Sequence, residues 1–386
     1  MATNKEQNKL NVPHLRFPEF HGEWEKHGLS EYLDFKNGLN LDSKRFGKGI
    51  KFISVMDILN NPVITYDCIR ASVQATDAEI SSFSVENGDI LFQRSSETLE
   101  DVGRANVYID DKVAVFGGFV IRGKKKANYN PLFFRYLLSS PYARKRIIPM
   151  GAGAQHFNIG QEGLSKVLLN FPSIEEQTKI ASLLHLLDER IATQSKLIEK
   201  LESLIKGIAQ HCIRELINGW EYVRLGDICK ITTGKLDANA QVENGQYPFF
   251  TCAERPFNID CYAFDTEALL ISGNGANLGY INYYKGKFNA YQRTYVLDHF
   301  SVNIQYVKWA LKVLLPQRIA IEKSSSNTPY IVLSTLADLK IPIPNNSKQN
   351  HIADLMMSFE RKLSTQLVLS DLYNKQKQYL LRQMFI

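Results

Sequence analysis

The stretch Phe171-Pro-Ser-Ile-Glu-Glu-Gln-Thr-Lys-Ile180 predicts the start of a long helix, and it decides how the chain is organised. Its Ser-Ile-Glu-Glu segment, directly after Pro172, has the pattern of a capping box, in which a serine and a glutamate three residues later bond to each other's backbone. From Ile180 onward, apolar residues recur at alternating spacings of four and three, the pattern of a helix that packs along one stripe. The predicted seam of this helix contains Ile180, Leu184, Leu187, Ile191, Ile198 and Leu201.

A second, weaker version of this helix closes the chain. The Pro, Gln and Ile of the first helix entry recur 172 residues later as Pro344, Gln349 and Ile352. A lysine replaces the glutamate of the capping box, and the stripe contains the polar residues Ser370 and Lys377. The apolar seam predicted for the second helix contains Ile352, Met356, Phe359 and Leu363.

The sequence before each helix is also duplicated. Three pairs of residues, each 196 positions apart, are Trp24 and Trp220, Leu29 and Leu225, and Gly38 and Gly234. The segment 88–92 resembles 267–271, and 114–121 resembles 289–296 with an offset of 175. The two offsets of 196 and 172 predict about 24 extra residues in the first copy. Matches in the same order at fixed offsets indicate a tandem duplication.

The predicted fold is α+β. Short β-type runs broken by Gly, Pro, Asn and Asp alternate with helical patches in two globular domains, 1–172 and 219–344. Long helices follow them over 173–218 and 345–386, and matching stripes favour an antiparallel coiled coil with pseudo-two-fold symmetry. A bundle that completes one core, or a helix used for dimerisation, is the alternative.

Composition and charge exclude several classes of protein. The 386 residues contain 46 Lys and Arg against 40 Asp and Glu, a formal charge of +6 that by itself is weak evidence for nucleic-acid binding. Five cysteines without CxxC spacing argue against a disulfide framework and a zinc site. The first ten residues are polar and no apolar run approaches the roughly 18 residues of a membrane span, so we expect a soluble, cytoplasmic protein.

Basic residues are concentrated in the second half of each globular domain. Nine basic residues and no acidic residue lie between Lys112 and Gln161, and the corresponding stretch of the second copy, 285–334, has seven basic residues against two acidic ones. This recurrence favours contacts with the phosphates of DNA or RNA, for which Lys124, Lys125 and Lys126 are candidates. An ordinary solvated surface is the alternative.

Reading a base sequence requires forked or amide side chains on loops: Arg for guanine, and Asn or Gln for adenine. Loops of this composition follow the predicted strand 90–92 and its counterpart in the second copy, and others precede each long helix; the segment 291–293 is a third candidate. The same residues also dominate ordinary turns, which is the alternative. The candidates are Arg94, Ser95, Arg104, Gln155, His156, Asn158, Asn274, Asn277, Gln292, Arg293, Ser325, Asn327 and Thr328.

Enzymatic motifs are weak. The glycines of Gly273-Asn-Gly275 and Gly279 give the spacing GxGxxxG, which does not match a dinucleotide loop, and no P-loop occurs. The eight histidines have no metal-ligand spacing. We therefore predict no catalytic residue and no metal site in this chain.

The duplicated architecture resembles the DNA specificity (S) subunit of type I restriction-modification systems. The resemblance covers the chain after about residue 12, and its most specific segments are 13–24 and 171–180. It implies two target recognition domains, each of which reads one half of a bipartite site on double-stranded DNA. It also implies that the long helices set the spacing between the halves and dock two methyltransferase (M) subunits.

The same resemblance implies a bacterial protein without cofactors of its own. S-adenosylmethionine is expected on the M subunits, and ATP with magnesium on endonuclease (R) subunits. Two other hypotheses remain: a stand-alone DNA-modifying enzyme with degenerate motifs, and a tandem protein-interaction scaffold.

Overall fold

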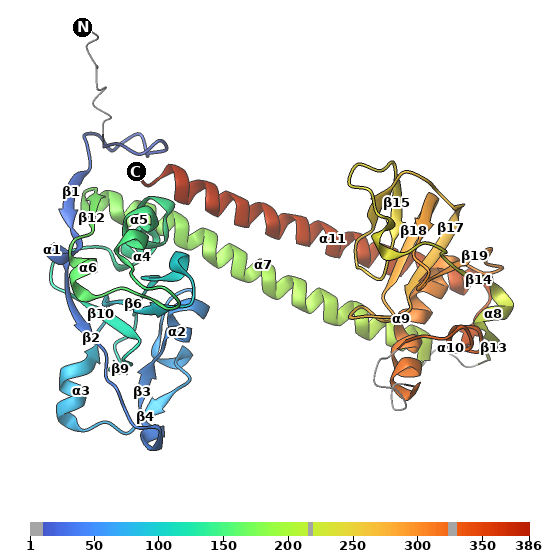
Figure 1. Cartoon of the computed structure of the whole chain (residues 1–386), viewed down its shortest axis with the longest axis horizontal. Coiled ribbons are helices and arrows are strands. Elements are labelled where there is room, and N and C mark those ends of the chain that lie inside the picture. The colour runs from blue at the N-terminus through green and yellow to red at the C-terminus, as the bar shows by residue number, and fades with distance from the viewer. Residues whose placement is uncertain (1–10, 215–218, 323–329) are drawn as a thin grey trace, which may run out of the picture. The chain divides into compact units, whose positions relative to one another are not determined.

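The computed structural model describes all residues except 1–10, 215–218 and 323–329. Two long helices dominate it, α7 (Ile174–Arg214) and α11 (Asn346–Gln383) (Figure 1). They begin one residue after the positions 173 and 345 given by the sequence pattern.

The chain divides into two compact units. Unit 1 contains Met1–Ser195 and Leu369–Ile386, and unit 2 contains Lys196–Val368. Each unit is larger than the predicted globular domain because it also includes the start of one long helix and the end of the other.

Unit 1 is built on two four-stranded sheets with the orders β2-β10-β6-β8 and β4-β3-β9-β5, in which only β3 and β9 run parallel. The strands of the first sheet are β2 (Leu33–Asn37), β10 (Val120–Lys125), β6 (Ile90–Gln93) and β8 (Ala105–Val107). Those of the second are β4 (Ser72–Val73), β3 (Phe46–Ile53), β9 (Ala114–Phe116) and β5 (Ser84–Val85).

Two short antiparallel ladders and several helices complete unit 1. The ladders join β1 (Glu25–Gly28) to β12 (Leu168–Phe171) and β7 (Ser95–Ser96) to β11 (Phe157–Asn158). The helices are α1 (Leu29–Tyr32), α2 (Val55–Asn60), α3 (Asp77–Phe83), α4 (Pro131–Ser139), α5 (Pro141–Ile147) and α6 (Gln161–Ser165), with 3-10 turns η1 (Ser43–Arg45), η2 (Tyr66–Cys68), η3 (Leu99–Asp101) and η4 (Ile148–Met150).

Unit 2 has one six-stranded sheet of order β14-β19-β17-β18-β15-β16. Its strands are β14 (Lys230–Thr233), β19 (Thr294–Asp298), β17 (Phe264–Ser272), β18 (Ile281–Ala290), β15 (Tyr247–Phe250) and β16 (Phe257–Ile259). A separate ladder joins β13 (Glu221–Arg224) to β20 (Lys340–Ile343). The remaining elements are α8 (Leu225–Ile228), η5 (Ala238–Ala240), α9 (Ile304–Glu322) and α10 (Leu333–Ala337).

The strand orders confirm the duplication. The run β14-β19-β17-β18 of unit 2 repeats β2-β10-β6-β8 of unit 1. Each unit also has one parallel strand pair, β3 with β9 in unit 1 and β15 with β18 in unit 2. Phe52 and Phe249 are equivalent, because each pairs with a parallel strand, and the offset between them is 197. At the equivalent strand ends Gln93 and Ser272 the offset is only 179. Most of the extra residues of the first copy are therefore the segment that forms α2, η2, β4, α3 and β5.

The predicted alignment of 114–121 with 289–296 is wrong by one residue. The Gly38 N–H donates to the Val120 carbonyl (3.1 Å), and the Gly234 N–H donates to that of Thr294 (3.3 Å). Val120 therefore corresponds to Thr294 with an offset of 174. Backbone contact decides this register, because a Cβ at Gly38 would lie 2.0 Å from the carbonyl oxygen of Gly117.

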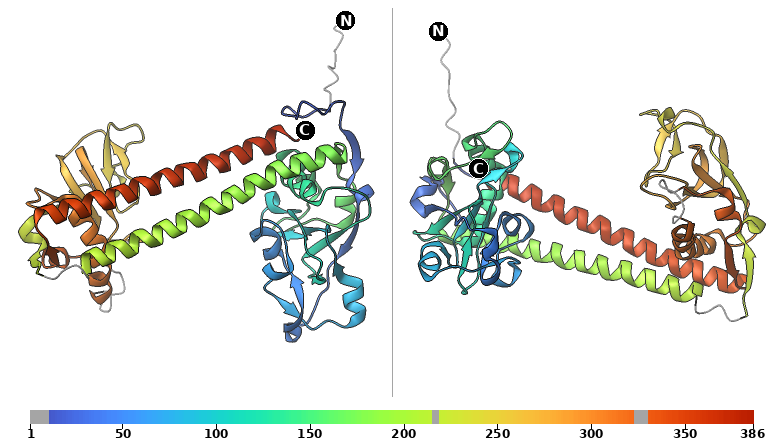
Figure 2. Two further views of the ribbon diagram at one scale, coloured as in Figure 1. Left: turned by 180° about the vertical axis from the view of Figure 1, so that it is seen from behind. Right: turned by 60° about the horizontal axis from the view of Figure 1, so that its bottom comes forward.

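The start of α7 and the end of α11 pack together within unit 1 (Figure 2). Arg190 donates to the Tyr373 hydroxyl (2.9 Å) and Asp188 pairs with Lys377 (2.5 Å), so the two helices run in opposite directions here. The ion pair also explains a polar residue at the predicted seam position 377. The predicted seam residues of both helices are buried or half-buried in the structure.

The helix caps differ from the predicted pattern. Ser173 Oγ accepts from the Glu176 N–H (3.3 Å), as predicted, but the Glu176 carboxylate binds Arg16 (2.7 and 2.8 Å) instead of completing the box. In α11, the Asn345 side chain accepts from the Lys348 N–H (3.0 Å). An asparagine cap thus replaces the missing capping box.

A buried glutamine fastens each long helix to its domain in the same way. Gln177 accepts from the Asn130 N–H (3.1 Å) and donates to the Pro172 carbonyl (3.0 Å). Gln349 does the same with Asn303 (3.0 Å) and the Pro344 carbonyl (2.8 Å). Asn130 and Asn303 also cap α4 and α9. In each unit, the glutamine amide therefore connects the start of the long helix to the start of a helix of the globular domain.

Replacing Gln177 by leucine should lower the free energy of unfolding of unit 1 by about 2 kcal/mol, because it leaves the part-buried Asn130 N–H and the buried Pro172 carbonyl without this partner. Urea unfolding followed by hydrogen exchange on unit 1 peptides measures this loss. The exposed Gln155→Leu variant is the control, and an equal effect of both substitutions would contradict the role of the buried amide.

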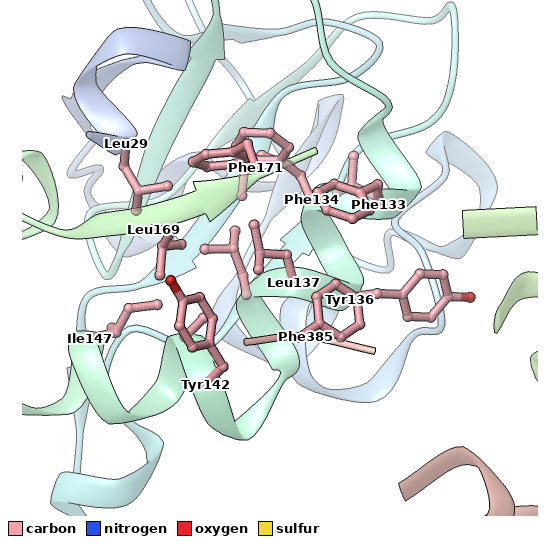
Figure 3. Close-up of a cluster of buried hydrophobic side chains, with 14 of the residues drawn as sticks. Leu29, Phe133, Phe134, Tyr136, Leu137, Tyr142, Ile147, Leu169, Phe171 and Phe385 are labelled. Atoms are coloured by element: carbon pink, nitrogen blue, oxygen red, sulfur yellow. The ribbon is translucent and has the colours of Figure 1, made fainter. Parts of the chain in front are cut away.

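The main core of unit 1 lies where α4 and α5 meet β12, and it includes the C-terminal end of the chain (Figure 3). Phe134 of α4 is fully buried and stacks on Tyr129 (4.0 Å between ring centroids) and on Phe171 of β12 (5.2 Å). Phe385 packs against Phe133 (5.7 Å). Apolar residues at helical spacing on α4 therefore supply the surface on which the start of α7 and the end of α11 pack.

Candidate nucleic-acid interface

Two predicted loops of unit 1, more than sixty residues apart in sequence, lie side by side. Strand β7, with Ser95, pairs with β11, with Asn158, and the Ser95 hydroxyl bonds to the Asn158 side chain. The Ile159 N–H donates to the Arg94 carbonyl (2.9 Å) and extends the contact. The structure therefore brings these two groups of candidates together at one edge.

A third segment, the turn Gly117–Phe119 between β9 and β10, joins this edge. The Arg94 N–H donates to the Phe119 carbonyl (2.9 Å), and the Arg94 guanidinium donates to the Gly118 carbonyl (3.3 Å). We call the edge formed by residues 94–96, 117–119 and 155–158 the recognition edge of unit 1. Sequence reasoning missed the turn because its glycines and phenylalanine do not have the side chains expected for base reading.

Unit 2 has the same arrangement. The Gly273 N–H donates to the Arg293 carbonyl (2.8 Å), and the Ile331 N–H donates to the Gly273 carbonyl (2.8 Å). Asn274 forms a β-bridge with Tyr330. We call residues 273–277, 291–293 and 330 the recognition edge of unit 2; its backbone connections match those of unit 1, whereas its side chains differ.

Several predicted residues of unit 2 are engaged within this edge. Asn274 accepts from the Cys252 thiol (3.0 Å), and Asn277 donates to the Cys252 carbonyl (3.0 Å). Gln292 donates to Asp237 (2.8 Å). These contacts fix the conformations of the loops. Each of these amides has one of its two polar atoms engaged, so only its other atom and any further lone pair or N–H could contact a base.

Arg293 is the exposed cation of this edge, and its guanidinium makes no hydrogen bond or ion pair with the described residues. Tyr330, which the sequence did not single out, is 54% exposed beside Asn274. The predicted residues Ser325, Asn327 and Thr328 lie outside the described residues.

The other candidates of unit 1 have mixed surroundings. Gln155 and His156 are exposed at the recognition edge. Arg104 forms an ion pair with Asp101 (2.6 Å), and its carbonyl accepts from the Gln93 N–H (2.7 Å), next to Arg94. Arg104 is therefore near the edge, with its charge partly balanced.

Lys124, Lys125 and Lys126 lie at the opposite end of β10 from the recognition edge. Val120 starts this strand beside the edge, and Lys124 is four residues later, about 13 Å along the strand. Lys124 forms an ion pair with Glu86 (3.0 Å). The lysine cluster is thus separated from the recognition edge by the length of β10.

Much of the basic stretch predicted for phosphate contact supports the domain itself. The buried Arg122 binds the Ser84 carbonyl, and Arg135 pairs with Asp188 (3.2 Å). Arg144 donates to two backbone carbonyls (2.7 and 2.8 Å), and burial lowers the pKa of its guanidinium to about 10. A count of charges along the sequence cannot distinguish these side chains from surface cations.

No helix within the described residues is long and apolar enough to cross a membrane. In that same part of the chain, no group of three or more His, Cys, Asp or Glu side chains is arranged to hold a metal ion.

Comparison with known proteins agrees with this architecture. The family model described as "Type I restriction modification DNA specificity domain" matches residues 21–203 and again 217–368. The type I restriction enzyme EcoDI specificity subunit of Escherichia coli is 44% identical over 135 residues, which cover 35% of this chain and 30% of that protein. The chain thus aligns with less than a third of the length of this relative.

Two solved structures share the fold. The S subunit of a type I restriction-modification system from M. genitalium has a TM-score of 0.66 at 18% identity and covers 97% of this chain and 99% of its own. A chain from a structure of complex assembly and conformational transition of the type I R-M system has a TM-score of 0.58 at 17% identity, with 93% and 96% covered. Since the family model matches both repeats, the chain belongs to the type I restriction-modification DNA specificity family and contains two copies of its domain.

Proposed function

We propose that this chain is the sequence-specific DNA-binding subunit of a type I restriction-modification complex, and that each domain reads one half of a bipartite site. The observation that carries the proposal is the repeated recognition edge. The same three backbone segments meet in both units through equivalent hydrogen bonds, yet they present Arg94, Ser95 and Phe119 in one and Asn274, Arg293 and Tyr330 in the other.

One scaffold with two different sets of side chains is suited to reading two different sequences. Base-specific contacts depend on the side chains at loop ends, whereas the β-ladders beneath set only their positions. A protein-interaction scaffold would not require this combination of amide, guanidinium and aromatic groups at one edge in each domain. We therefore favour DNA recognition over that alternative.

The long helices are proposed to set the distance between the two half-sites and to dock the partner subunits. Each helix has exposed apolar side chains outside the seam, including Leu186, Leu197 and Leu204 on α7 and Leu367 and Leu372 on α11. Exposed leucines on a helix are suited to packing against helices of another subunit. Two M subunits with S-adenosylmethionine, and R subunits with ATP and magnesium, would supply the chemistry that this chain is proposed to lack.

Exchange of residues 219–344 for the corresponding segment of a family member with another target should change one methylated half-site and leave the other unchanged. The junctions are suitable because both strands of the β13–β20 ladder lie inside the exchanged segment. The donor should retain an asparagine at position 303, which binds Gln349. Sequencing of methylated adenines in cells that contain the chimera and its M subunits measures the outcome.

The reciprocal exchange of residues 13–172 is the control, and it should change only the other half-site. A change of both half-sites by either exchange would contradict independent reading by the domains. Methylation or cleavage of DNA by the purified chain alone would instead establish a stand-alone enzyme.

A further inference from the structure

An apolar hollow opens beside the recognition edge of unit 1. It has a volume of about 360 Å³, and the side chains that line it include Phe46, Phe52, Met56 and Phe119, with Ser95 of the recognition edge among the polar ones. Phe119 is 69% exposed, Met56 60% and Phe46 44%. Three large apolar side chains thus remain in solvent at the place where the domain is proposed to meet DNA.

The exposure of Phe119 is built into the fold. Its carbonyl is held by the Arg94 N–H, and the preceding Gly118 is packed so closely that a Cβ there would lie 1.8 Å from the Asn40 side-chain oxygen. Gly117 is fixed in the same way, because a Cβ there would meet the Phe52 ring at 2.6 Å. The turn therefore has little freedom to fold the ring away from water.

The corresponding position in unit 2 is occupied by an arginine. The Phe119 carbonyl accepts from Arg94 and the Arg293 carbonyl accepts from Gly273, at matching points of the two repeats. Phe119 and Arg293 thus occupy equivalent backbone positions in the two units, one with an exposed ring and the other with an exposed guanidinium. Arginine at a base edge reads guanine, whereas an apolar side chain reads the methyl group of thymine.

We propose that Phe119 and the hollow beside it recognise the C5-methyl group of a thymine in the half-site read by unit 1. This inference rests on the proposed function and assigns a base to one residue of that site. Exposed Lys44 and Lys48 flank Phe46 along the chain and are suited to bind the phosphates on either side. Ser95, at the rim, would supply a polar contact to the same or the adjacent base pair.

The test compares thymine with deoxyuridine, which lacks only the methyl group. Duplexes carry the complete recognition sequence, as established by sequencing of methylated adenines, with each thymine of the unit 1 half-site replaced in turn. Binding is measured with the full chain in its methyltransferase complex. One replacement should weaken binding by the unmodified protein about fourfold, the value of one buried methyl group.

The Phe119→Ala variant should bind the thymine and deoxyuridine duplexes equally at that position. The matched control is Leu168→Ala, which truncates a side chain of unit 1 that is 47% exposed on β12, and which should retain the fourfold difference. Replacements in the half-site read by unit 2 should have the same effect in Phe119→Ala as in the unmodified protein.

Three outcomes would overturn the inference and leave the proposed function intact: a unit 1 half-site without thymine, insensitivity of the unmodified protein to every replacement, or full sensitivity in Phe119→Ala. Equal weakening of binding to all sequences by Phe119→Ala would indicate a ring wedged between base pairs and would also overturn it. Absence of any sequence preference in the unmodified complex would contradict the proposed function itself.

Discussion

Replacement of Phe134 by alanine should destabilise unit 1 by about 3–5 kcal/mol, the largest effect that we expect from a single core substitution. The ring is fully buried and contacts three aromatic neighbours: Tyr129 at 4.0 Å, Phe171 at 5.2 Å and Tyr32 at 5.3 Å between centroids. Its removal leaves a cavity and also ends two stacked ring pairs. Because β12 leads directly into α7, the substitution should also loosen the start of that helix.

Hydrogen exchange measured during urea unfolding of the full chain distinguishes the two units. Exchange in peptides of α4, β12 and the start of α7 should accelerate, and exchange in unit 2 strands should not. Phe119→Ala is the matched control, because the same ring is lost from an exposed position and the expected change is within about 0.5 kcal/mol. Similar losses in both variants would contradict the assignment of the core.

Replacement of Asp188 by asparagine should cost unit 1 about 3 kcal/mol, because it removes the only anion from a largely buried group of charges. The carboxylate pairs with Lys377 (2.5 Å) and Arg135 (3.2 Å), and it accepts from the Tyr136 hydroxyl (2.8 Å). The side chains of Asp188 and Arg135 are each only 14% exposed. Loss of the negative charge leaves two cations facing one another.

The same group should make unit 1 sensitive to acid. Burial alone would raise the pKa of Asp188, but the Lys377 ion pair and the Tyr136 hydrogen bond outweigh it and hold the pKa below its usual value of 3.8. A carboxylate with a lowered pKa stabilises the folded state at pH values above its unfolded pKa, and this contribution disappears as the pH falls through the folded pKa. The unmodified protein should therefore lose stability below about pH 4, and Asp188→Asn should lose less.

Asp371→Asn is the control for both measurements. Asp371 also lies on the part of α11 that belongs to unit 1, but it pairs with Lys375 at the surface, where the two side chains are 59% and 72% exposed. Such a pair contributes less than about 1 kcal/mol. An effect of Asp188→Asn no larger than that of Asp371→Asn would show that the buried charges do not fasten α11 to unit 1.

Sequence periodicity was sufficient to predict both long helices and the duplication. A helix that buries one stripe must repeat apolar residues at every turn, and a repeated domain must repeat its backbone-determining residues, such as Gly38 and Gly234. The predicted alignment of 114–121 with 289–296 was nevertheless one residue out. Similarity of residue types suggested an offset of 175, whereas the hydrogen bonds that the Gly38 and Gly234 N–H groups donate give an offset of 174.

The functions of the polar and charged residues were less predictable. Arg122, Arg135 and Arg144 look like surface cations in a linear charge count, but each is held by a carbonyl or carboxylate within its domain. Conversely, Phe119 looks like a core residue in sequence, and the turn places it in solvent. Burial depends on which distant segments meet, and a local pattern has no information about that.

The amino-acid sequence by itself determined that this protein is a tandem repeat of an α+β domain and a long helix, because helical periodicity and duplication are local or linear properties of a chain. The tertiary structure alone decided which residues share the recognition edge. Arg94, Phe119 and Asn158 are separated by up to 64 positions, and they meet because backbone hydrogen bonds join β7 to β11 and residue 94 to the turn before β10. Those bonds form only when the whole domain packs.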